Sequence, residues 1–200
     1  MSKTVIQPIG DIAPVEGKEK KRSSDPAQAE YDDGKEFLKN KEFGQAALAF
    51  HNALLAFEEK SNENGVANAS NQLALLCLGR EDYVKALEHL RRSFGICERK
   101  DDPMSMNLLS KQMVIAHRGL RQTQEAIRIC LDLVQGYNMD NNPHETVQML
   151  ELMAEIYLDG GERAKAADTY RTIASIHANY KHRSIAAGFI SKAEALEASA

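Results

Sequence analysis

Alanine recurs in this chain at a fixed interval of 40 residues, at positions 46, 86, 126 and 166. Four residues after each alanine stands a larger residue: Phe50, Leu90, Cys130 and Tyr170. Residues four apart lie on one face of an α-helix, so each pair would present a small and a larger side chain to a neighbouring helix. A period of this length predicts an array of stacked helical repeats.

Signals for helix starts recur with the same period. A polar residue followed by proline suits an N-cap and the first helical position, and this pattern occurs at 25–26, 102–103 and 142–143. Gly79, Gly119 and Gly160 stand near equivalent places, and we expect them to supply left-handed backbone at helix ends.

Between these marks, apolar residues recur at steps of three and four, and alternation typical of β-strands is scarce. The sequence therefore predicts an all-α fold in which short connections make consecutive helices antiparallel. We expect helices at 26–40, 43–60, 65–79, 83–99, 103–119, 123–138, 143–159, 163–180 and 183–198.

Composition excludes several classes of protein. The formal net charge is −4, and the one basic cluster, KEKKR at 18–22, reads as a solvated linker rather than a nucleic-acid or anionic-lipid contact. The sequence contains no run of 18 apolar residues, so it predicts no membrane span. The N-terminus does not resemble a secretory signal. Three widely spaced cysteines fit structural thiols in a reducing compartment, so we expect a cytoplasmic protein.

Residues 1–24 differ from the rest, because they contain prolines, glycines and charges without a helical period. We expect a disordered N-terminal tail. Its two apolar pieces, TVIQPI at 4–9 and DIAPV at 11–15, could make an extended contact with a partner or with the chain itself. A tail that binds nothing is the plainer alternative.

No catalytic motif is present, and we expect neither an enzyme nor a cofactor. His177 and His182 are the one pair of histidines near metal-ligand spacing, but residues five apart on a helix do not share a face well, so we expect no metal site. His117 occupies a core-like position and is expected to be a hydrogen-bonded core residue.

The residues of the first repeat resemble the tetratricopeptide repeat (TPR) family, which pairs a small-x-x-aromatic motif in one helix with A-x3-F in the next. Gly34 with Phe37 matches the first motif, and Ala46 with Phe50 matches the second. The period of 40 exceeds the family's usual 34, as in its long-helix variants. The resemblance implies a right-handed α-solenoid with four TPR-like hairpins over 25–182. It also implies a capping helix at 183–200, with apolar positions Ile185, Phe189, Ala193 and Leu196.

In that family, the first helices of successive repeats line a concave groove that binds peptides. Mapped by register, the expected groove residues are Tyr31, Lys35, Asn68, Asn71, Gln72, Leu75, Lys111, Gln112, Ile115, Gln148, Glu151 and Glu155. Long-helix members use a ladder of amides to hold an extended backbone, and Gln72 and Gln112 give part of one here. A solvated polar helix face is the alternative interpretation.

The resemblance implies a non-enzymatic adaptor that binds a peptide or partner protein on its concave face. The alternative is an accessory or assembly subunit of a larger complex that docks through its N-terminal tail or convex face. Neither interpretation requires nucleic acid or membrane insertion, and both allow a homo-oligomer.

Overall fold

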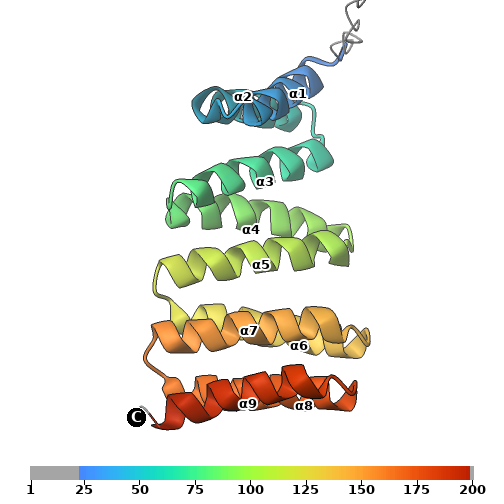
Figure 1. Ribbon diagram of the computed structural model, residues 1–200. Coiled ribbons are helices and arrows are strands. Elements are labelled where there is room, and N and C mark those ends of the chain that lie inside the picture. The colour runs from blue at the N-terminus through green and yellow to red at the C-terminus, as the bar shows by residue number, and fades with distance from the viewer. Residues whose placement is uncertain (1–22, 199–200) are drawn as a thin grey trace, which may run out of the picture.

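The computed structural model describes residues 23–198, which form nine α-helices and no strand (Figure 1). The all-α prediction is confirmed, and every predicted boundary agrees to within two residues. Of the predicted disordered tail, residues 1–22 lie outside the described part of the chain. The helices are α1 Pro26–Lys39, α2 Phe43–Glu59, α3 Glu63–Gly79, α4 Tyr83–Arg99, α5 Pro103–Gly119, α6 Thr123–Met139, α7 Pro143–Asp159, α8 Arg163–Asn179 and α9 Arg183–Ala198.

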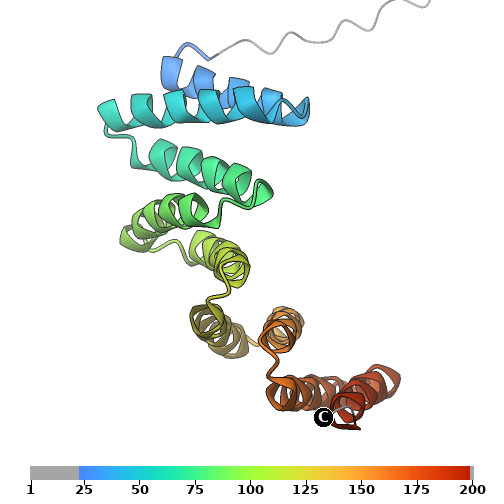
Figure 2. The same ribbon diagram turned by 90° about the vertical axis from the view of Figure 1, so that its left-hand side faces the viewer.

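Consecutive helices pack as four antiparallel hairpins, and α9 closes the array against α8. In Figure 2 the first hairpins are seen from the side while α5 and α6 are seen nearly end-on, so the stack twists along its length. Each helix from α2 to α8 has 17 residues. Because three residues separate each helix from the next, the 40-residue period is two units of the same length.

All the connections between the described helices share one backbone conformation. The middle residue of each has a positive φ: Lys41, Ser61, Glu81, Asp101, Arg121, Asn141, Gly161 and Lys181. Two backbone hydrogen bonds close each turn, as where Asp102 N–H donates to the Cys97 carbonyl at 3.0 Å and Asp101 N–H to Glu98 at 3.1 Å. This is the Schellman arrangement, which satisfies carbonyls at the end of the helix.

The prediction that Gly79, Gly119 and Gly160 supply the left-handed residue is wrong. Gly79 and Gly119 are the last residues of α3 and α5, and Gly160 is a right-handed C-cap. The left-handed position falls one or two residues later, usually on a polar or charged side chain. At Gly119 the lack of a side chain has another reason, because a Cβ there would lie 2.3 Å from the Tyr83 ring.

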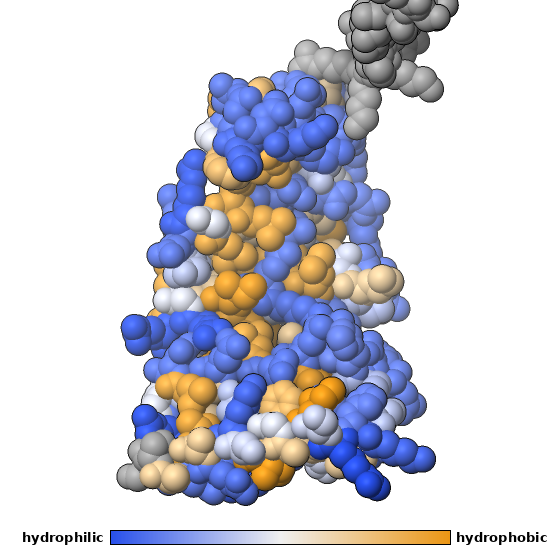
Figure 3. Space-filling model, viewed as in Figure 1, coloured by the Kyte–Doolittle hydropathy of each residue, from blue (hydrophilic) through white to orange (hydrophobic). Residues whose placement is uncertain are grey.

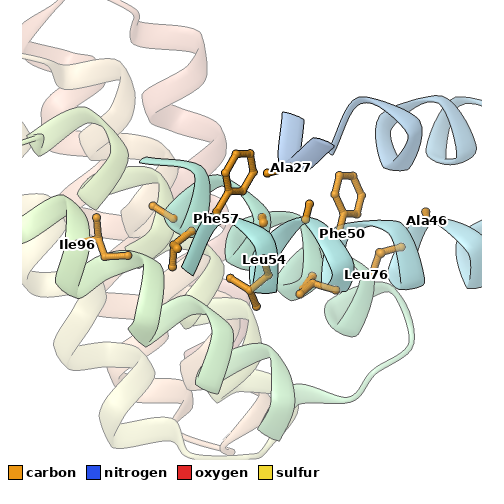
Figure 4. Packing of buried hydrophobic residues seen from close by; sticks show 12 residues of the cluster. Ala27, Ala46, Phe50, Leu54, Phe57, Leu76 and Ile96 are labelled. Atoms are coloured by element: carbon orange, nitrogen blue, oxygen red, sulfur yellow. The ribbon is translucent and has the colours of Figure 1, made fainter. Parts of the chain in front are cut away.

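The recurrent alanines lie in the packed core of the array. Ala46, Ala86, Ala126 and Ala166 are all fully buried, and so are the larger residues Phe50, Leu90 and Cys130 four positions on. Figure 4 shows the cluster at the N-terminal end, where Phe50 and Phe57 project from α2 beside Ala27 of α1. The small-then-large pattern therefore builds the core of the array.

The last helix caps the array with a narrower apolar face than predicted. Ala186, Phe189 and Ala193 are buried against α8, whereas Ile185 is 49% exposed. Ile185, one of the four predicted apolar positions, therefore lies to one side of the buried face.

The predicted N-caps are confirmed at Asp25, Asp102 and Asn142, each with proline in the first turn of its helix. Asn62 caps α3 through the Gly65 amide at 3.1 Å, which is why α3 begins at Glu63 rather than at the predicted residue 65. Hydrogen bonds from the hydroxyl and the backbone amide of Ser105 lower the pKa of the Asp102 carboxyl.

This lowered pKa predicts a pH effect on stability. A carboxyl whose folded pKa lies below its unfolded value of about 3.9 stabilises the fold above that pH, and the contribution is lost as the pH falls through the folded pKa. Asp102→Asn keeps a capping oxygen but does not titrate. We expect the variant to match the parent at pH 7 and to lose less of its urea midpoint between pH 5 and pH 3. Equal losses for both proteins would contradict this account of the cap.

Candidate interaction surface

The helices α3, α5, α7 and α9 lie on the side of the array that faces the viewer in Figure 1. Within this layer α3 also contacts α5 directly, across the boundary between two hairpins. We call the outer surface of α1, α3, α5 and α7 the odd-helix face. All the groove residues that the sequence predicts lie on these four helices.

The predicted groove residues differ in exposure. Exposed members are Lys35, Asn68, Leu75, Ile115, Gln148 and Glu155. Half-buried members are Tyr31, Asn71, Gln72, Lys111 and Glu151, and Gln112 is buried. All members of the predicted set except Gln112 are therefore at least partly exposed to solvent.

Exposed apolar side chains gather over α3 and α5. Leu75, Leu108 and Ile115 are each between 41% and 52% exposed. Figure 3 shows the hydrophobic residues in this part of the odd-helix face, with hydrophilic residues on both sides. Sequence reasoning missed Leu108, although it stands 40 residues after Asn68 and 40 before Gln148 and could have been found by register.

Two amide oxygens under this apolar area have no hydrogen-bond partner within the described chain: Asn71 Oδ1 and Gln112 Oε1. One repeat earlier, Gln72 hydrogen-bonds Tyr31, and burial is the main cause of the raised pKa of the Tyr31 hydroxyl. Asn71 and Gln112 stand 40 residues after Tyr31 and Gln72, so by register they hold the equivalent places on α3 and α5. An amide therefore stands on α3 where a hydroxyl stands on α1 one repeat earlier.

The other half of the face, between α5 and α7, is held by ion pairs. Lys111 pairs with Glu145, and Arg118 contacts Asp159 at 2.6 Å and Glu155 at 2.8 Å. The hydrogen bond to Asp159 raises the pKa of the Arg118 guanidinium most strongly. Burial lowers the pKa of Lys111, but hydrogen bonds to Glu145 and Tyr137 outweigh burial, and the pKa lies above its ordinary value. Unpaired polar atoms and exposed apolar groups thus coincide at α3 and α5.

No group of three potential ligands among His, Cys, Asp and Glu comes together within residues 23–198. His177 and His182 do meet, with 3.4 Å between their Nδ1 atoms, because the turn after α8 folds the chain back. The reasoning that five residues keep them apart is therefore wrong. Burial raises the pKa of the Cys130 thiol to about 12, so this sulfur stays protonated and unreactive.

His117 is buried, as predicted for a core residue, and its Nδ1 lies 2.6 Å from Gln122 Oε1 across the next turn. Between residues 23 and 198, no helix has the length and apolar character that a bilayer crossing needs.

No protein-family model and no curated protein sequence matches the chain. Solved structures do match its fold. One is a crystal structure described as the nearly identical TPR-like repeats of a Podosopora anserina kinesin light chain, with a TM-score of 0.67, 13% identity and coverage of 82% of this chain and 81% of that one. Another is the apo form of RapI, with a TM-score of 0.65, 12% identity and coverage of 88% of this chain.

This chain spans 54% of the length of RapI. At such low identities, the likeness concerns the fold alone. The chain has a TPR-like α-solenoid fold of four hairpins and a capping helix, as its sequence predicts. Solenoids of this type generally present extended surfaces for protein interaction and are typically non-catalytic.

Proposed function

We propose that this protein is a non-enzymatic adaptor whose odd-helix face binds an extended segment of a partner protein across α3 and α5. The observation that carries the proposal is the pair of unpartnered amide oxygens on Asn71 and Gln112. A buried acceptor without a donor destabilises a protein by about 1–3 kcal/mol. If these two side chains turned outward on binding, backbone N–H groups of an extended segment would supply the missing donors.

The residues around these amides fit the same ligand. Leu75, Leu108 and Ile115 offer apolar contacts to alternate side chains of an extended segment. Asn68 and Lys35 add polar groups at the α1–α3 end, while the paired charges of α7 would border the site. A reducing, cytoplasmic location belongs to this proposal, because all three cysteines are free thiols.

A second function has an observation of its own. Leu48 and Leu55, seven residues apart on α2, are 63% and 46% exposed. Both lie on an even-numbered helix, away from the odd-helix face, and residues seven apart share a helix face. This apolar stripe favours an accessory subunit that docks in a larger complex through its convex side.

The adaptor proposal predicts that Gln112→Leu stabilises the free protein while it weakens partner binding. Leucine fits this position, because Leu152 holds the equivalent site in α7. Removing the unpartnered amide should raise the free energy of unfolding by about 1 kcal/mol. Urea denaturation measures the stability, and quantitative capture of partners from native lysate by full-length chain measures the binding.

Gln135→Leu is the matched control, because Gln135 is exposed on α6, which is not one of the helices of the odd-helix face. It should change neither quantity. If Gln112→Leu retains every partner that the parent captures, the adaptor proposal is wrong. If Leu48→Asp releases those partners instead, the accessory-subunit function is favoured.

A further inference from the structure

An apolar pocket opens at one edge of the array, between the first two hairpins. Its volume is about 220 Å³, and its wall is formed by Leu38, Phe43, Gln72, Leu75, Leu76, Gly79 and Arg80. Phe43 remains 51% exposed and Leu75 41% exposed. We call this cavity the edge pocket.

The edge pocket owes its opening to particular residues. A Cβ at Gly79 would meet no atom within 4 Å, so this glycine leaves open space at the end of α3. One repeat later, the corresponding Gly119 lies against the Tyr83 ring, which occupies the place that a side chain would take. An aromatic residue and three leucines thus border a space of side-chain size that no described residue fills.

The chain itself carries a segment that suits this pocket. Residues 4–15, TVIQPIGDIAPV, contain aliphatic side chains in a stretch whose prolines and glycine disfavour a helix. Ile9, Ile12 and Val15 recur at steps of three residues. Their side chains are of a size to enter a cavity of about 220 Å³.

The distance along the chain permits the contact. The edge pocket lies at the C-terminal end of α1, and α1 has 14 residues. At about 1.5 Å per residue, the helix is about 21 Å long. The eight residues from Val15 to Ser23 span up to about 26 Å at about 3.3 Å per residue. The segment before Val15 can therefore reach the pocket if the linker runs beside α1.

Charge favours that path. The linker is EGKEKKR at 16–22, in which lysines and arginine outnumber the glutamates. On α1, the carboxylates Glu30, Asp32, Asp33 and Glu36 outnumber Lys35 and Lys39. A basic linker laid along an acidic helix reduces repulsion on both. A short tether also gives its segment an effective concentration of about millimolar order, so a weak contact suffices.

We propose that residues 9–15 of this chain dock in the edge pocket of the same molecule, with an aliphatic side chain seated among Leu38, Phe43 and Leu75. The proposal does not rest on the adaptor function, because it needs no partner. Docking would bring the apolar pieces of the N-terminal segment into contact with the exposed Phe43.

The absence of tryptophan from the sequence provides a direct test. Ile12→Trp, made in the full-length chain, places a single fluorescent reporter in the segment, and Glu19→Trp places one in the linker as a control. We expect Ile12→Trp to emit at shorter wavelength than Glu19→Trp and to lose most of the acrylamide quenching that the control shows. The shift should be independent of protein concentration.

Adding Leu75→Asp to Ile12→Trp should restore solvent-like emission and full quenching, and Phe43→Ser should do the same. Adding Leu131→Asp, at a 49% exposed leucine on α6, should leave the shift in place. Circular dichroism checks that each variant is folded. Solvent-like emission from Ile12→Trp alone, a shift that survives both pocket variants, or a shift that grows with concentration and so reports a second copy would each overturn the proposal.

Discussion

Leu90→Ala should lower the free energy of unfolding by about 2–5 kcal/mol, which is the range for leucines removed from well-packed cores. Leu90 is fully buried in α4 and packs in one cluster with Ala74 of α3 and Leu109 of α5. Its removal leaves a cavity at the junction of two hairpins. Because helices hold their neighbours on both sides, the cavity has little freedom to collapse.

The position of Leu90 in the array adds a second expectation. In a solenoid, stability is roughly the sum of the repeats and of their interfaces with nearest neighbours. A cavity in the middle should therefore weaken the coupling between the N-terminal and C-terminal hairpins. Hydrogen exchange should accelerate most in α3, α4 and α5 and less in α8 and α9.

Leu48→Ala is the matched control for this prediction, because Leu48 is 63% exposed on α2. Surface substitutions of this kind change stability by about 0.5 kcal/mol or less. Chemical denaturation of both variants gives the comparison. Equal losses for Leu90→Ala and Leu48→Ala would contradict the assignment of Leu90 to the core.

The regular parts of this fold could be predicted because the sequence repeats them. The alanine period predicted buried core positions, and the polar-proline pairs predicted the starts of α1, α5 and α7. The turns could not be predicted in the same way. Their left-handed residues include Lys41, Ser61 and Arg121, and hydrogen bonds from the following backbone hold them there rather than the residue type.

The candidate site, too, could be predicted from the sequence only in part. Register alone assigned the predicted residues to the odd-numbered helices, since register depends only on the period. Burial at Gln112 could not be predicted, because it depends on how closely α3 approaches α5. The meeting of His177 with His182 depends likewise on the turn that follows α8. The spacing of residues in the sequence does not reveal contacts that depend on a turn of the chain or on how closely two helices approach.

Gly65→Ala should destabilise the protein by about 1–3 kcal/mol, although alanine favours helix more than glycine does. Gly65 is buried in the first turn of α3, and a Cβ there would lie 2.3 Å from Cγ and Cδ1 of Phe57. These atoms belong to the base of the ring and cannot swing away. Phe57 is also only 2% exposed, so the ring has no space to move into.

Gly136→Ala is the control that separates packing from helix propensity. Gly136 lies inside α6, and a Cβ there would meet nothing within 4 Å. The same substitution should therefore stabilise the protein by about 0.5–1 kcal/mol. Urea denaturation of the two variants should move the midpoint in opposite directions. If both variants gain stability, the Phe57 ring can move to make room for a methyl group. Close approach of α2 to α3 would then not be the reason for glycine at position 65.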